Sequence, residues 1–165
     1  MQVTVLAEEP RPAYDRVQLS GFFTGKSAQD LSLVADGQYE ALGAVLRLNC
    51  RVSAIDTAAR TVTTADGETL AYDRLVLATG SYPFVPPIEG RDRPGCFVYR
   101  TIEDLEAMQA AGRTGRVGTV VGGGLLGLEA AKALKDMGLE THVVEFAPRL
   151  MAVQVDDAGG ALLRR

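Results

Sequence analysis

Alternation of hydrophobic and polar positions predicts a series of short strands in the first half of the chain. Asp66-Gly67 lies between two of these segments and favours a tight hairpin turn. A short helix is expected over 38–42, ended by Gly43. The segments that follow the period of two are 2–7, 45–48, 52–56, 61–64, 69–72 and 75–78.

The pattern changes after Gly80. A proline-rich stretch over 81–95 follows neither the period of two of a strand nor the period of 3.6 of a helix, and it is expected to link two domains. An amphipathic helix is predicted over 101–111, with Thr101 as its N-cap and Asp104 completing a capping box.

Residues 117–145 carry the most informative pattern in the chain. An apolar strand over 117–121 leads into glycines at 122, 124 and 127, a helical pattern, and a second apolar strand over 141–144. In such a strand–turn–helix unit the first glycine permits the tight turn and the second lets the backbone approach a pyrophosphate. The third allows close packing of helix on strand. The phosphates are then expected at the positive end of the helix, near Leu125 and Leu126.

Glu145 ends the second strand, 23 residues after Gly122. An acidic group about 20 residues beyond the glycine turn accepts hydrogen bonds from a free ribose and repels a 2′-phosphate. The sequence therefore predicts a dinucleotide site that prefers NADH to NADPH.

The start of the chain has features of a second, interrupted nucleotide fold. The strand over 2–7 ends in Glu8 and Glu9, as in a βαβ unit, but no glycine turn stands before it. The helical pattern at the other end is followed by no further strand. We expect an α/β protein with two Rossmann-like, three-layer dinucleotide-binding folds, both incomplete, as in a fragment or a truncated gene.

Composition narrows the function classes. The net charge is −4, and no run of Lys or Arg forms a basic stripe, so nucleic acid is not expected as a partner. No apolar stretch is long enough for a bilayer, and no signal peptide is recognisable, so we expect a cytoplasmic protein. Cys50 and Cys96 match no metal or redox spacing and are expected to be buried, and no metal site is predicted.

Several phrases of the sequence resemble the flavoprotein reductases with two dinucleotide-binding folds. They are EEPRPAYDRVQLS, YDRLVLATGSYPFVPPIEG, CFVYRTIEDL and VVGGGLLGLEAAKAL followed by ETHVVEFAPRLMA. This family includes rubredoxin and ferredoxin reductases, the pyridine nucleotide–disulfide group and the flavin module of nitrite reductase large subunits, which the sequence resembles most. The resemblance implies a partial FAD-binding domain over 1–97 and the N-terminal portion of an NAD-binding domain over 98–165.

The resemblance also implies cofactor-binding roles for individual residues. Glu8, with Glu9 as the alternative register, would hold the adenosine ribose of FAD, and the backbone at Val52 would meet its adenine. Ala78, Thr79 and Gly80 match a motif that passes close to the flavin. The NADH set implied in the same way is Gly122, Gly124, Leu125, Leu126, Gly127, Glu129 near the nicotinamide end, and Glu145.

Two departures from the pattern of the wider family refine this interpretation. Gly21 stands where many ferredoxin-reductase relatives have a lysine; the nitrite-reductase group also tends to lack that lysine, so the difference favours this group. No C-x-x-x-x-C disulfide motif is present. A disulfide-reductase mechanism is therefore not expected. Since cofactors carry hydride transfer, no catalytic acid or base is predicted.

Three functions stay open at this point. The first is an NADH–FAD module that supplies electrons to the siroheme and iron–sulfur centres of a nitrite reductase large subunit, which lie outside this chain. The downstream domains, or a small subunit, would then be its partners. The second is a stand-alone reductase of the rubredoxin or ferredoxin type, and the third is a catalytically silent remnant that binds NADH.

Overall fold

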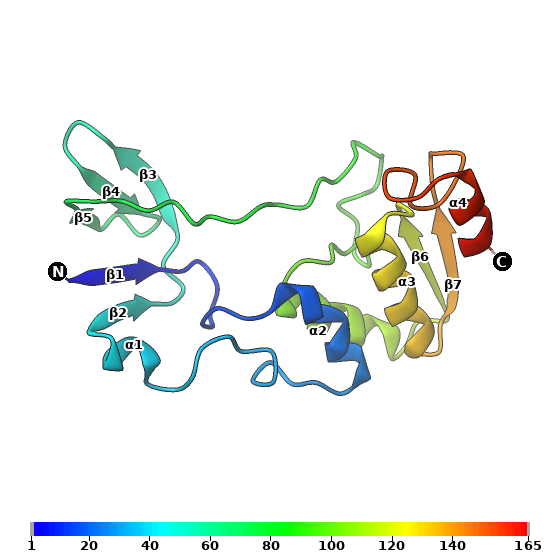
Figure 1. Ribbon diagram of the computed structural model, residues 1–165, viewed down its shortest axis with the longest axis horizontal. Coiled ribbons are helices and arrows are strands. Elements are labelled where there is room, and N and C mark those ends of the chain that lie inside the picture. The colour runs from blue at the N-terminus through cyan, green and yellow to red at the C-terminus, as the bar shows by residue number, and fades with distance from the viewer. Residues whose placement is uncertain (1, 165) are drawn as a thin grey trace. The chain divides into compact units, whose positions relative to one another are not determined.

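The computed structural model describes residues 2–164, which fold as two compact units (Figure 1). The first unit contains the residues up to Asp15 together with Leu31–Ser81. The second contains Arg16–Asp30 and the residues from Tyr82 onward. Each unit is built around its own sheets and helices, and each is described separately below.

The first unit has a two-stranded parallel sheet. Strand β1 (Val3–Leu6) pairs with β2 (Ala44–Arg47), so that Val3 lies opposite Ala44. Helix α1 (Gln38–Ala41) directly precedes β2 and is followed by Gly43 at a φ of 65°. The predicted strand, helix and glycine stop are thus confirmed. Glycine suits this position because a residue without Cβ adopts a positive φ at little cost.

The same unit has a three-stranded antiparallel sheet, in which β4 (Thr61–Thr64) lies between β3 (Val52–Asp56) and β5 (Thr69–Ala71). The predicted Asp66-Gly67 turn joins β4 to β5, with Gly67 at a φ of 91°. Thr64 is buried beside the turn and accepts a hydrogen bond from the amide of Glu68 at 3.1 Å. This hydrogen bond joins the end of β4 to the residue that precedes β5.

The strand expected over 75–78 is not formed. The segment lies outside every sheet, and Val76 and Leu77 are largely exposed. A strand is stable only when its N–H and C=O groups pair with a neighbour. In the part of the chain that the structure describes, the strands pair only within the sheets given above and the β6–β7 pair below, so hydrophobicity alone does not make this segment a strand.

The second unit contains the strand–helix–strand unit predicted over 117–145. Strand β6 (Val117–Val121) pairs in parallel with β7 (Glu140–Val144), and α3 (Leu125–Asp136) connects them and packs on both. The contact is close, because a Cβ on Gly118 of β6 would lie 2.8 Å from Leu134 Cδ1 on α3. The other helices are η1 (Arg16–Thr24), a 3-10 helix, α2 (Ile102–Gly112) and α4 (Asp157–Leu163).

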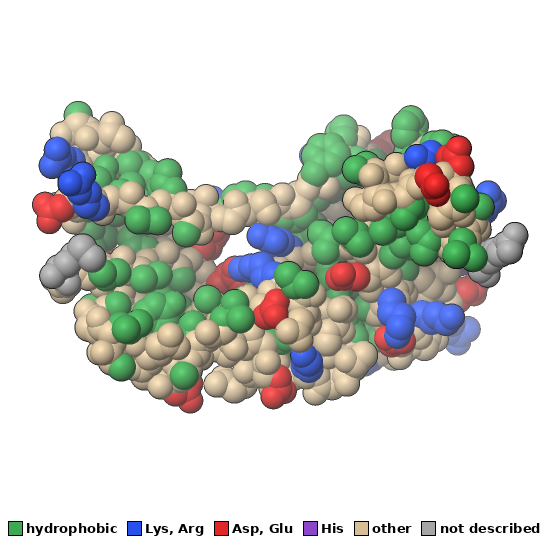
Figure 2. All heavy atoms as spheres, viewed as in Figure 1, with side chains coloured by type: hydrophobic (Ala, Val, Ile, Leu, Met, Phe, Trp, Pro, Cys, Tyr) green, Lys and Arg blue, Asp and Glu red, His purple; other side chains and the backbone are tan. Residues whose placement is uncertain are grey.

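Helix α2 supplies the most deeply buried side chains of this unit, Ile102 and Leu105. Its predicted capping box is confirmed: Thr101 Oγ1 accepts from the Asp104 amide at 3.2 Å, and Asp104 Oδ2 accepts from the Thr101 amide at 2.8 Å. Hydrophobic side chains also lie on the surface of both units (Figure 2). Cys50 is buried as predicted, but Cys96 is exposed, because it lies directly after the proline-rich stretch, in a segment without helix or strand.

Candidate functional site

The three predicted glycines lie together at the turn from β6 into α3. Gly122 has a φ of 116°, a conformation that side-chain-bearing residues rarely adopt, and its amide donates to the carbonyl of Val144 at 2.8 Å. The chain therefore leaves β6 while still hydrogen-bonded to the end of β7. This geometry brings the turn next to Glu145, which directly follows β7.

Gly127 lies in the first turn of α3, directly against the glycine turn. A Cβ at this position would lie 1.9 Å from the carbonyl oxygen of Gly122 and 2.9 Å from its carbonyl carbon. The colliding atoms belong to the backbone and cannot rotate away. Glycine is therefore required here for the helix to start so close to the end of the strand.

Gly124 is the N-cap of α3, and its environment differs from that of Gly127. Its backbone is extended (φ −82°, ψ −172°), and a Cβ would meet no atom within 4 Å. The fold itself would thus accept alanine at this position. Packing among the described residues therefore does not require a glycine here, and the neighbouring Leu125 and Leu126 are exposed.

The Glu145 carboxylate is held by backbone amides. Ala147 donates to Oε1 at 2.7 Å, and Gly123 donates to Oε2 at 2.5 Å. These two hydrogen bonds, with that of Ala147 the stronger influence, lower the pKa of Glu145 below its usual value. The group is therefore an anion at neutral pH, fixed beside the glycine turn.

Glu129 lies further along α3 and is half-buried. Tyr99, which the sequence did not indicate as a site residue, lies within its electrostatic influence: burial and the charge of Glu129 raise the pKa of Tyr99 to about 12. The Tyr99 hydroxyl is buried with no hydrogen-bond partner among the described residues, and its ring stacks on Phe23 with centroids 6.3 Å apart. No sequence motif marks this tyrosine, because its partners come from separate segments.

In the first unit, Glu8 and Glu9 follow β1. Glu9 Oε2 accepts a hydrogen bond from the Tyr14 hydroxyl at 2.6 Å, so its carboxylate is tied to the protein. Glu8 is more exposed, and Arg51 Nε lies 3.7 Å from Glu8 Oε1. Of the two registers considered from sequence, Glu8 has the more exposed side chain.

The other residues predicted to bind FAD also belong to the first unit. Val52 opens β3, at an irregularity in its pairing with β4. Ala78, Thr79 and Gly80 lie in the exposed extended segment after β5, with Gly80 at a φ of 66°. Of these positions only Thr79 carries a polar side-chain group, a hydroxyl that can donate and accept hydrogen bonds.

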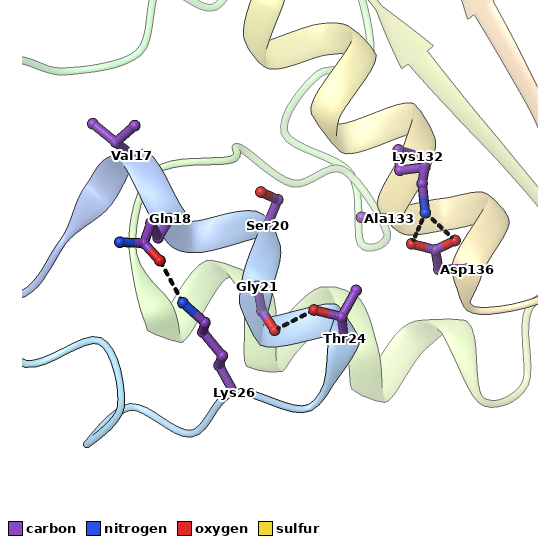
Figure 3. A pocket seen from close by; sticks show the side chains of 9 residues that line it. All are labelled: Val17, Gln18, Ser20, Gly21, Thr24, Lys26, Lys132, Ala133 and Asp136. Carbon is purple, nitrogen blue, oxygen red and sulfur yellow. Dashed lines mark hydrogen bonds and ion pairs between the residues drawn. The ribbon is translucent and has the colours of Figure 1, made fainter.

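A shallow pocket in the second unit lies between η1 and α3 and contains none of the predicted residues (Figure 3). Its charged groups are already paired: Lys26 donates to Gln18, and Lys132 Nζ lies 2.6 Å from Asp136 Oδ1. The stem of Lys26 covers Gly21, whose Cβ would lie 2.8 Å from Lys26 Cδ. The residues that line the pocket are Val17, Gln18, Ser20, Gly21, Thr24, Lys26, Lys132, Ala133 and Asp136.

Over residues 2–164, no cluster of His, Cys, Asp and Glu could hold a metal ion. Within the same residues, no helix is both long and apolar enough to cross a bilayer.

A glycine turn on the N-terminus of a helix, with a fixed carboxylate at the end of the next strand, defines a dinucleotide-binding α/β protein. Comparison with protein families narrows this class: the pyridine nucleotide-disulphide oxidoreductase family matches residues 1–165. The chain belongs to this family.

Its similarity to individual proteins extends over nearly the whole chain. It is 54% identical over 163 residues to the NADH nitrite reductase large subunit of Escherichia coli K12, covering 99% of this chain and 19% of that protein. The corresponding NAD(P)H enzyme subunit of Klebsiella oxytoca is 56% identical over 163 residues, covering 99% of this chain and 17% of that subunit. The chain therefore spans about a fifth of the length of these relatives.

Solved structures show the same fold. A ferredoxin reductase from Rhodopseudomonas palustris superimposes with a TM-score of 0.90 at 26% identity, covering 99% of this chain and 41% of the reductase. The α/β fold of the FAD/NAD(P)-binding reductases, predicted from the sequence, is thus confirmed.

We predict that Gly127→Ala destabilises the protein. The new Cβ would force α3 away from Gly122, which should lower the free energy of unfolding by about 1–3 kcal/mol, the usual cost of overpacking. Urea unfolding followed by circular dichroism measures this change. Gly124→Ala is the matched control, since its Cβ meets no atom within 4 Å. Equal stability of the two variants would contradict the assigned role of Gly127.

Proposed function

We propose that this chain is the NADH–flavin module of a nitrite reductase large subunit, through which electrons from NADH enter the enzyme. The observation that carries the proposal is the dinucleotide turn with its fixed carboxylate, within a chain more than half identical to two such subunits. In this proposal residues 1–97 form the FAD-binding portion and residues 98–165 the NAD-binding portion. The acceptor centres and a small subunit belong to the rest of the enzyme, in the cytoplasm.

The residues of the second unit fit NADH. Gly124 leaves room at the N-terminus of α3, where backbone amides and the helix dipole favour the pyrophosphate. Glu145 presents a carboxylate that is charged at neutral pH, and such a group accepts hydrogen bonds from a free ribose. The same charge repels a 2′-phosphate, which gives the preference for NADH.

The residues of the first unit fit one end of FAD. Glu8 follows a strand of a parallel sheet, is exposed, and can accept hydrogen bonds from an adenosine ribose. The only G-x-G-x-x-G motif of the chain is the one at 122–127, so this sequence contains no separate glycine turn for the flavin pyrophosphate. The proposed FAD contacts are therefore limited to Glu8, Val52 and the 78–80 segment.

When bound, flavin accepts a hydride from reduced nicotinamide and passes electrons on singly. The chain's part in this reaction is to bind and orient. Gly122 and Gly127 fix the turn that receives the pyrophosphate, and Glu145 fixes the adenosine end. Glu129, beside the buried Tyr99, supplies a negative charge further along the same helix, where the nicotinamide is proposed to lie.

A second candidate is a stand-alone reductase that passes electrons to a small redox protein. The observation that favours it is the TM-score of 0.90 with a ferredoxin reductase. The two candidates share the NADH and flavin sites and differ in the electron acceptor.

The experiment that tests the proposed function is the visible absorption spectrum of the purified chain after incubation with FAD and desalting. Retained flavin bands that NADH bleaches under anaerobic conditions are the expected result. A colourless protein that still binds NADH would contradict the flavin part of the proposal and support a remnant that only binds NADH. Titration with NADH by isothermal calorimetry separates these outcomes.

We further predict that Glu145→Arg weakens NADH binding and reduces the discrimination against NADPH. The substitution removes the ribose acceptor and places a cation where the 2′-phosphate would lie. The dissociation constant for NADPH divided by that for NADH should fall by about tenfold or more. NADH loses a hydrogen bond to a charged group, and NADPH gains an attraction between its 2′-phosphate and the arginine. Unchanged affinities for both nucleotides would refute the ribose assignment.

A further inference from the structure

Gly123 lies between the first two glycines of the turn, at a position where the dinucleotide motif specifies no residue. It is buried, and both of its backbone polar groups are engaged by the segment after β7. Its amide donates to Glu145 Oε2 at 2.5 Å, and its carbonyl accepts from the Met151 amide at 2.8 Å. Gly123 thus ties the glycine turn to the loop that carries Glu145.

A Cβ on Gly123 would fit only if its neighbours shifted. A Cβ would lie 3.1 Å from Glu145 Oε2, 3.2 Å from Glu145 Cβ and 2.5 Å from Leu150 Cδ2. Its φ is not among the positive values of the chain, so backbone strain does not explain the glycine. The requirement comes from its neighbours: Leu150 Cδ2 makes the shortest contact, and the Glu145 side chain that the Gly123 amide holds makes the next two.

The two hydrogen bonds to Glu145 are not equivalent. The Ala147 amide lies two residues further along the same loop and moves with Glu145, whereas the Gly123 amide belongs to the pyrophosphate turn. Only the bond from Gly123 fixes the carboxylate relative to the place where the phosphates would bind. This bond therefore sets the distance between the glycine turn and the Glu145 carboxylate, which are proposed to contact opposite ends of the ADP moiety.

We propose that Gly123 is a specificity-determining residue, which positions the Glu145 carboxylate for a free ribose and so maintains the preference for NADH over NADPH. This inference rests on the proposed NADH site and adds to it the residue that makes Glu145 effective. A side chain at 123 would displace the carboxylate from the ribose, although the charge itself would remain in the protein.

The test compares the dissociation constants of NADH and NADPH, measured by calorimetry on the 165-residue chain. For Gly123→Ala we expect NADH binding to weaken by about tenfold, the effect of losing one hydrogen bond to a charged group, while NADPH changes little. For Gly124→Ala, the matched control one residue away, NADH and NADPH should weaken equally, because its Cβ would meet the pyrophosphate that both share.

A double-mutant cycle separates positioning of Glu145 from simple packing. If Gly123 acts through the carboxylate, Gly123→Ala should change the NADPH/NADH ratio no further in a Glu145→Ala background. If Gly123→Ala changed the NADPH/NADH ratio as much in the Glu145→Ala background as in the wild type, the proposal would be overturned. Should the alanine variant fail to fold, Gly123→Ala with Leu150→Ala removes the shortest contact and still leaves Cβ against Glu145, so the same loss of preference is expected.

The remaining outcomes distinguish this inference from the proposed function. A wild-type chain that binds neither nucleotide would overturn the proposed NADH site, and this inference with it. A wild-type chain that prefers NADH, with a preference unchanged in Gly123→Ala, would overturn the role of Gly123 alone.

Discussion

The contact between Gly127 and the carbonyl of Gly122 is the constraint on which the rest of the candidate site depends. Because no side chain separates them, α3 begins directly at the end of β6. The N-terminus of the helix is thereby brought to the edge of the parallel strand pair, where Glu145 leaves β7. The glycine turn and the Glu145 carboxylate, proposed to bind the pyrophosphate and the ribose, become neighbours through this single close approach.

Backbone groups, more than side chains, then define the chemistry of this region. Two amides hold the Glu145 carboxylate and keep it ionised, and a helix N-terminus without a side-chain cap faces the exposed end of the turn. Such a site distinguishes ligands by where charge and hydroxyl groups lie along a dinucleotide. In the proposed function, its part is to bind and orient cofactors that perform the electron transfer.

Local signals in the sequence were sufficient for most of the fold. The Thr101 capping box, the Asp66-Gly67 hairpin and the strand–glycine–helix unit each depend on residues close together in the chain, and all are formed. The segment 75–78 was wrongly predicted as a strand because pairing depends on a distant partner, which hydrophobicity does not specify. The exposed Cys96 was missed for a similar reason, since burial depends on what surrounds an irregular segment.

The candidate site shows the same division between local and distant determinants. The glycine motif and the acidic strand end were recognisable because their spacing follows from the length of one helix and two strands. Gly123 and Tyr99 were not, because what distinguishes them is their packing against Glu145, Leu150 and Phe23 and the charge of Glu129, all of which lie elsewhere in the chain. A motif thus indicates a candidate site, while the contacts around it depend on residues that the motif does not specify.

The central claim is that Glu145 and the glycine turn together form a site for the ADP portion of NADH. Calorimetric titration of the wild-type chain with ADP-ribose and with its 2′-phosphorylated form tests it most directly, since neither ligand requires flavin or a nicotinamide. We expect ADP-ribose to bind at least about tenfold more tightly than its 2′-phosphorylated form, because the fixed Glu145 carboxylate repels the 2′-phosphate. Equal binding of the two ligands, or binding of neither, would contradict the claim.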